Sequence, residues 1–85
     1  MPKYPVTASV GPIHIDDTFT YHAPHGDQVA RFAENRDAAK EFAKLLVSNC
    51  PPCAELTLAL RAIQTAMFHA NAAMAINEKP QDAAP

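Results

Sequence analysis

The sequence predicts an all-α protein: an antiparallel helical hairpin with an extended N-terminal arm that assembles into a homo-oligomer. Three observations lead to this prediction. The 85 residues contain two helical patterns separated by a proline-containing break, and alanine is the commonest hydrophobic residue, with no Trp. A chain this short buries a small fraction of its surface, and oligomerisation is a common remedy. We therefore divide the chain into an arm (1–26), a hairpin (27–78) and a flexible tail (79–85).

The arm is predicted to be extended, and no strand is assigned in it. Residues 1–18 mix prolines and a glycine with short alternating stretches such as Ile13-His14-Ile15. Pro24 and Gly26 then interrupt the chain. Asp27 is a suitable N-cap for the helix that follows, because Asp side chains accept hydrogen bonds from the first helical N–H groups.

The first helix is predicted from residue 27 or 28 to residue 48. Apolar residues recur on one face at helical spacing, which is typical of an amphipathic helix: Val29, Phe32, Ala39, Phe42, Ala43, Leu45 and Leu46. The segment Asn49-Cys50-Pro51-Pro52-Cys53 ends this helix, because proline cannot continue a helix.

The second helix is predicted from residue 54 to residue 77. Its apolar seam alternates spacings of four and three: Leu56, Leu60, Ile63, Met67, Ala70 and Met74. A link this short predicts antiparallel helices. Asn71 is interpreted as an inter-helix hydrogen-bonding residue that fixes the register. Apolar positions outside the seam point to self-association: Leu58, Ala62, Ala66 and Ala73.

Composition excludes several classes of function. The formal net charge of -2 argues against DNA binding, because nucleic-acid-binding proteins usually carry a basic surface. No apolar run approaches the roughly 20 residues that a membrane helix needs, and no signal-peptide pattern opens the chain, so a cytosolic protein is expected. The chain lacks a glycine-rich phosphate loop and a nucleophile elbow. We therefore expect neither enzyme activity nor a cofactor.

The cysteine pair and the histidine pair suggest two other kinds of site, a redox motif and a zinc site, which the sequence pattern favours less. Cys50 and Cys53 form a CxxC motif, but the βαβ context of a redox motif is absent. His22 and His25 together with the two cysteines have the residue types of a zinc site. The first helix, about 30 Å long, separates the two pairs, so a contact between chains would be needed to join them.

Four residues are candidates for ligand binding. Tyr21 is either a packing anchor or a ring that stacks on a nucleobase. Arg36 is predicted to lie inside the apolar seam of the first helix, where it either pairs with a carboxylate of a neighbouring chain or binds phosphate. Lys40 is either a solvated charge or an addition to the positive field around Arg36. The fourth candidate is His25, in the arm four residues after Tyr21.

Several short blocks, in order and with compatible spacing, resemble the phage anti-CBASS cyclic-nucleotide sponge family (anti-CBASS protein two). Members of this family carry an aromatic-Thr-Tyr-His-Pro-Pro-Lys-Gly-Asp-Gln arm, a Cys-Pro turn, an Ala-Asn-Ala-Ala segment and a terminal Asn-Glu. The corresponding blocks here are Phe19 to Gln28, Cys50-Pro51, Ala70-Asn71-Ala72-Ala73 and Asn77-Glu78. The resemblance covers residues 19–78.

The resemblance implies a compact homohexamer in the cytoplasm of the infected bacterial host. Such a protein sequesters cyclic dinucleotides (cGAMP-like) without cleaving them and so blocks CBASS anti-phage defence. Tyr21 is implied to stack on the nucleobase and Arg36 to reach the phosphates. His25 stands where the arm usually has Lys, so its charge depends on pH. The resemblance also implies a second pocket for cyclic trinucleotides, but Ile76 stands where an arginine is expected.

The alternative to a nucleotide sponge is a helical oligomeric protein-interaction module with no nucleotide ligand. Both hypotheses share the fold and the self-association, and they differ only in what the arm holds.

Overall fold

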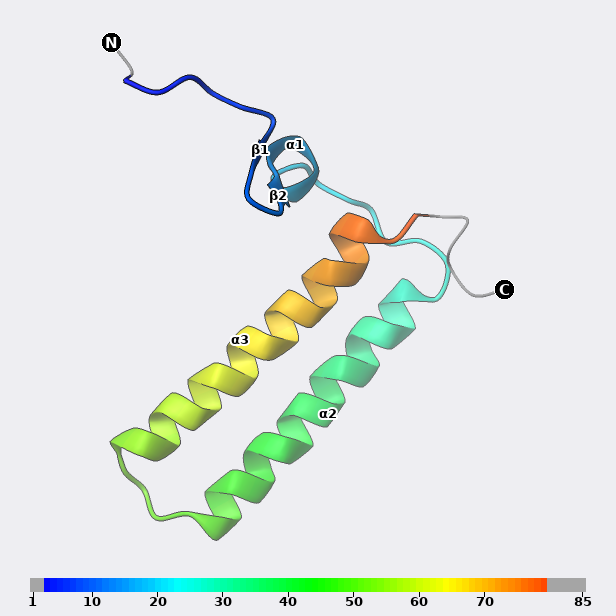
Figure 1. Cartoon of the computed structure of the whole chain (residues 1–85). Coiled ribbons are helices and arrows are strands. Elements are labelled where there is room, and N and C mark those ends of the chain that lie inside the picture. The colour runs from blue at the N-terminus through cyan, green and yellow to red at the C-terminus, as the bar shows by residue number, and fades with distance from the viewer. Residues whose placement is uncertain (1–2, 80–85) are drawn as a thin grey trace.

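Two long antiparallel helices dominate the structure, a computed structural model that describes residues 3–79. The elements in chain order are β1 (Ser9–Val10), β2 (Ile13–His14), α1 (Ile15–Thr18), α2 (Gln28–Asn49) and α3 (Ala54–Asn77). Figure 1 shows α2 and α3 side by side, with the arm at the end of the hairpin where α2 begins and α3 ends. The predicted all-α fold class and helical hairpin are confirmed, and α2 ends one residue later than predicted.

The arm contains more secondary structure than the sequence predicts. β1 and β2 pair antiparallel, with Ser9 opposite His14 and Val10 opposite Ile13. Gly11 sits in the turn between them with φ of 58°, a left-handed conformation that glycine adopts without a steric penalty. The sequence pattern did not identify this strand pair. Two-residue strands and a four-residue helix are too short to produce a recognisable hydrophobic period.

The seam of α3 follows the predicted pattern for most of its length. Leu56, Leu60, Ile63, Met67 and Met74 are half-buried, whereas Ala70 is exposed. The helix also begins where predicted, with Cys53 as its N-cap residue. The regular alternation of apolar residues therefore identified the packed face of this helix correctly.

The seam of α2 differs from the prediction at four positions. Val29, Phe42 and Leu45 are 65%, 51% and 54% exposed, and Arg36 is exposed rather than inside the seam. The half-buried face instead passes through Asn35, whose Nδ2 donates to Asn71 Oδ1 at 3.0 Å. An α-helix has 3.6 residues per turn, so the residue that follows Phe32 on one face can be either three or four positions later. Here the packed face continues at the third position, Asn35, and not at the fourth, Arg36. The predicted inter-helix hydrogen bond of Asn71 is confirmed.

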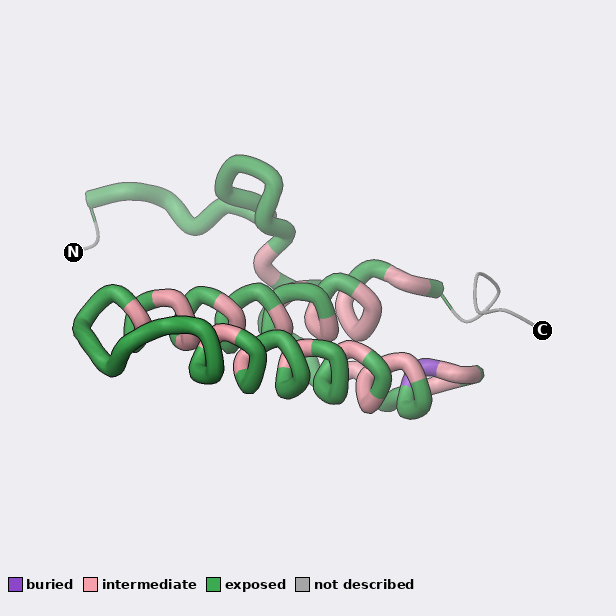
Figure 2. The backbone as a smooth tube through the Cα atoms, turned by 90° about the horizontal axis from the view of Figure 1, so that it is seen from below, coloured by how far each residue is buried: buried purple, intermediate pink, exposed green. Residues whose placement is uncertain are grey.

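A single copy of the chain has almost no buried interior. Among the described residues only Gln28 is buried, at 1% exposure, and no apolar side chain is buried. Figure 2 shows this one buried position at the arm end of the hairpin. The radius of gyration is 17.2 Å, against about 12 Å for a compact domain of this length. The single copy is therefore a flat, extended unit whose apolar surface is left uncovered.

No helix among residues 3–79 combines the length and the apolar character needed to cross a membrane.

Candidate functional site

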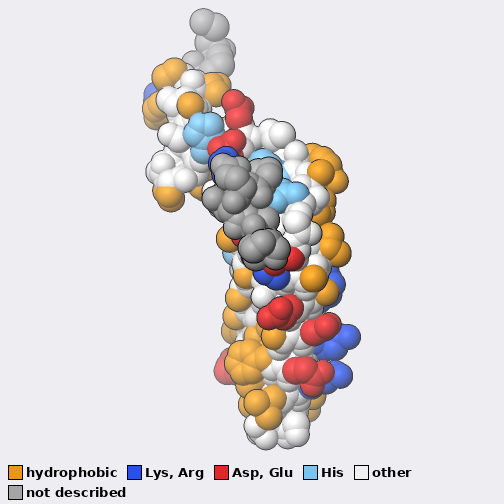
Figure 3. Space-filling model, turned by 90° about the vertical axis from the view of Figure 1, so that its right-hand side faces the viewer, with side chains coloured by type: hydrophobic (Ala, Val, Ile, Leu, Met, Phe, Trp, Pro, Cys, Tyr) orange, Lys and Arg blue, Asp and Glu red, His pale blue; other side chains and the backbone are white. Residues whose placement is uncertain are grey.

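A pocket lies between the arm and the end of α3, and we call it the arm pocket. Its volume is about 320 Å³, and its lining residues are Tyr21, His22, Ala23, His25, Ala75, Ile76, Glu78 and Lys79. Ligand sites in proteins usually begin at about 300 Å³, so the arm pocket in one copy has the size of a small site or of half a larger one. Histidine side chains gather at this end of the molecule in Figure 3.

Tyr21 presents its ring at the edge of the arm pocket. The side chain lies on the extended stretch that follows the arm's strands and α1, and the residue is 84% exposed. A tyrosine that packed its own fold would lose most of this exposure, because aromatic rings contribute through the area that they bury. The observed placement leaves a flat aromatic surface available to a ligand.

His22 and His25 fix the arm around Tyr21. His22 Nε2 lies 2.6 Å from the carbonyl oxygen of Asp17, and His25 Nε2 lies 3.2 Å from that of Glu78. A carbonyl oxygen can only accept, so each Nε2 carries the hydrogen. His25 Nδ1 is buried and has no hydrogen-bond partner within the described part of the chain.

A cluster of polar side chains joins the start of α2 to the end of α3, and we call it the clasp: Asp27, Gln28, Arg31 and Glu78. Gln28 Nε2 donates to the Met74 carbonyl at 3.1 Å and to Glu78 Oε1 at 3.0 Å. Its Oε1 accepts from the main-chain N–H of His25 at 3.2 Å. Gln28 thus bonds to three residues on two segments, the arm and the end of α3, so its polar atoms are satisfied although it is the one fully buried side chain among residues 3–79.

Arg31 completes the clasp by pairing with two carboxylates. Its Nη2 lies 2.9 Å from Asp27 Oδ1 and also donates to Glu78 Oε1. Hydrogen bonds to Glu78 and then to Asp27 raise the pKa of Arg31 above its ordinary value. Hydrogen bonds from Arg31 and then Gln28 lower the pKa of Glu78.

The sequence reasoning missed Arg31 entirely. One half of the clasp has a local signal, because Asp27 and Arg31 are spaced i, i+4 at the start of a helix. The pairing with Glu78 has none, since the two residues are 47 positions apart. Asp27 is the N-cap residue, as predicted, but its side chain makes no capping bond and pairs with Arg31 instead.

The four predicted ligand residues are not gathered in one place in a single copy. Tyr21 and His25 line the arm pocket, whereas Arg36 and Lys40 lie farther along α2 and do not line it. Both basic side chains are exposed, and within residues 3–79 neither has an ion-pair or hydrogen-bond partner. A single copy therefore does not bring the four predicted residues into one pocket.

The zinc alternative is not assembled within one copy. Cys50 and Cys53 are free and exposed in the link between α2 and α3, at the far end of the hairpin from the arm (Figure 1). Among residues 3–79 no three metal-binding side chains come together.

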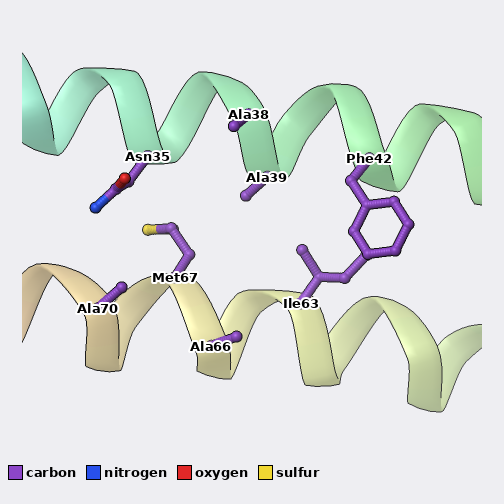
Figure 4. A pocket seen from close by; sticks show the side chains of 8 residues that line it. All are labelled: Asn35, Ala38, Ala39, Phe42, Ile63, Ala66, Met67 and Ala70. Atoms are coloured by element: carbon purple, nitrogen blue, oxygen red, sulfur yellow. The ribbon is translucent and has the colours of Figure 1, made fainter.

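An apolar groove runs between α2 and α3 on one face of the hairpin. Figure 4 shows its lining, to which both helices contribute: Asn35, Ala38, Ala39, Phe42, Ile63, Ala66, Met67 and Ala70. Its volume is about 440 Å³. Phe42 remains 51% exposed, so a single copy leaves this surface accessible.

The fold and the site define a class: small helical hairpin proteins with an N-terminal arm that carries an exposed aromatic ring beside a pocket. The family model of the Acb2/Tad1 hairpin domain matches residues 11–75. The chain belongs to this family of phage anti-defence proteins. No curated protein and no solved structure matches the chain.

Proposed function

We propose that this protein captures cyclic dinucleotide signals of the cGAMP type and holds them without cleavage, which blocks CBASS anti-phage defence. It would act in the cytoplasm of the infected bacterial host. The observation that carries the proposal is the exposed ring of Tyr21 at the edge of the arm pocket. Membership of the Acb2/Tad1 family supports it. Bases stack readily on such rings, with a contribution of about 1–3 kcal/mol for each base.

The phosphates require positive charge, and we propose that a neighbouring copy supplies it. Arg36 is exposed on α2 and does not line the arm pocket of its own chain. A homohexamer would place Arg36, with Lys40 one turn beyond, against the pocket of another copy. The guanidinium is planar and can form two parallel hydrogen bonds to one phosphate. His25 lines the arm pocket and fixes the arm to the end of α3 through the Glu78 carbonyl.

Self-association would also cover the exposed apolar groove. The eight residues that line it leave an apolar surface which a second hairpin could cover. Burial of apolar surface stabilises by about 25 cal/mol per Å², and a single copy has no buried apolar side chain within its described residues. Assembly therefore supplies the core that one copy lacks and brings the arm pocket close to the basic residues of another copy.

Calorimetric titration against a panel of cyclic dinucleotides tests the proposal. Cyclic trinucleotides form a second panel, which tests whether a second pocket is kept although Ile76 stands where an arginine is expected. After saturation the protein is denatured and the released nucleotide is identified by mass spectrometry. Tight binding with the nucleotide returned intact supports a sponge, and a changed nucleotide would show an enzyme. Absence of binding across the cyclic dinucleotide panel would refute the proposal.

The second candidate function is a helical oligomeric protein-interaction module with no nucleotide ligand. The apolar groove favours it, because exposed apolar surface of this kind commonly marks a protein contact. A module of this type would self-associate normally and would show no heat of binding with any nucleotide. The titration therefore separates the two functions.

A further inference from the structure

The arm is held at the point where His25 meets the end of α3. His25 donates from Nε2 to the Glu78 carbonyl, and its main-chain N–H donates to Gln28 Oε1. On the other side of this point Tyr21 is 84% exposed, so the ring contributes little to its own placement. The position of Tyr21 relative to the hairpin therefore depends on the contacts of His25 with Glu78 and Gln28, together with the packing of α1 against α3.

Glu78 lies directly after α3, as its C-cap residue, where the chain leaves the regular helix. Its Oε1 accepts from Gln28 Nε2 and from Arg31 Nη2, while its carbonyl accepts from His25. Arg31 is in turn held by Asp27, one helical turn earlier on α2. The chain of contacts thus runs from α2 through Arg31 to Glu78, and from Glu78 to the arm.

We propose that Arg31 is a positioning residue for ligand capture: by holding Glu78, it fixes the carbonyl to which His25 binds and so keeps the arm, with Tyr21, in the binding geometry. Arg31 does not line the arm pocket, so it acts through other residues. This inference rests on the proposed function for its effect on affinity, but its effect on the arm is independent of any ligand.

The expected change in Kd follows from the fraction of molecules whose arm is in the binding-competent conformation. The apparent dissociation constant equals the intrinsic one divided by the fraction of protein in the competent conformation. If loss of the Arg31 contacts leaves the arm in place about a tenth of the time, the Kd rises about tenfold.

The test compares Arg31→Gln with the matched control Arg61→Gln. Arg61 is exposed on α3 and bonds to Gln64 on the same helix, far from the arm. Affinity for cyclic GMP–AMP is measured by calorimetry in the wild-type and Tyr21→Ala backgrounds. Hydrogen exchange of residues 19–26 is measured without ligand. Circular dichroism and light scattering establish that each variant keeps its helices and its oligomeric state.

A second variant keeps the inference testable if Arg31→Gln does not fold. Asp27→Asn weakens the hold on Arg31, and Asn is as good an N-cap residue as Asp. It is expected to move both readouts in the same direction, by a smaller amount.

We expect Arg31→Gln to raise the Kd about tenfold and to speed hydrogen exchange in the arm, with Arg61→Gln unchanged in both. We expect the loss of affinity to disappear when Tyr21 is already Ala, because the clasp then has no ring to position. Arm exchange equal to that of the wild type would overturn the inference, as would an undiminished loss in the Tyr21→Ala background. If the wild type binds no cyclic nucleotide, the proposed function fails, and the exchange measurement still decides the role of Arg31 in the arm.

Discussion

Replacement of Gln28 by Ala should destabilise the protein more than any other single polar substitution on α2. Gln28 is the one buried side chain of the described chain, 1% exposed. It bonds to the Met74 carbonyl, to the His25 N–H and to Glu78. Alanine removes all three bonds. It leaves the His25 N–H without this partner, whereas the Met74 carbonyl still accepts from the Glu78 N–H.

The expected loss of stability is worked out from the two hydrogen bonds that Gln28 makes to main-chain groups. A typical intramolecular hydrogen bond contributes about 0.5–1.5 kcal/mol net, so two of them predict a loss of about 1–3 kcal/mol in the free energy of unfolding. The better helix propensity of alanine returns only a few tenths of a kcal/mol. The loss of the Glu78 contact acts in the same direction as the main-chain bonds.

Urea unfolding followed by circular dichroism measures the effect. The chain concentration is fixed, because the proposed assembly would make the apparent stability depend on it. Gln64→Ala is the matched control, since Gln64 is an exposed glutamine on α3 that accepts one bond from Arg61. It should change the free energy of unfolding by less than about 0.5 kcal/mol. If Gln28→Ala is as stable as this control, the junction is not held by Gln28 and the reasoning is wrong.

Three further predictions concern the site. Tyr21→Ala should weaken cyclic dinucleotide binding by about 1–3 kcal/mol through lost stacking, while Tyr21→Phe and the exposed Phe19→Ala retain it; equal affinity of Tyr21→Ala and wild type in calorimetry would remove the ring from the site. Arg36→Gln should lower affinity about tenfold, as expected for a lost charge-assisted bond, with the oligomer intact by light scattering; dissociation of the oligomer would instead indicate a structural role. Because its pKa is lowered from 4.5, the Glu78 carboxylate stabilises the fold above pH 4.5, and this stability is lost as the pH falls through the lower folded pKa. Urea midpoints between about pH 6 and pH 3 should fall more steeply in the wild type than in Glu78→Gln, and parallel curves would contradict the pairing with Arg31.

The hairpin could be predicted from the sequence because its signals are local and repeated. The four-and-three spacing from Leu56 to Met74 specifies one face of α3, and proline residues mark the link. The same logic failed at Arg36, because α2 has a polar residue, Asn35, on its packed face. The spacing of apolar residues cannot reveal a polar residue whose side chain packs against another polar side chain.

The candidate site could be predicted only in part. The arm motif singled out Tyr21 and His25, and both line the arm pocket. The clasp was missed because Arg31 and Glu78 are brought together only by the antiparallel packing of α2 and α3. Contacts between residues so far apart leave no local period, whereas each residue alone is an ordinary charge on a helix or at its end.

Polar contacts and apolar surface have separate roles in this molecule. Apolar burial has no preferred direction, so a two-helix rod with small side chains could slide along its seam at little cost. The Asn35–Asn71 bond and the clasp are directional, and they set the register of the hairpin and the place of the arm. Substitutions in the apolar groove should therefore act first on assembly, whereas substitutions in the clasp should act first on the arm and on what it holds.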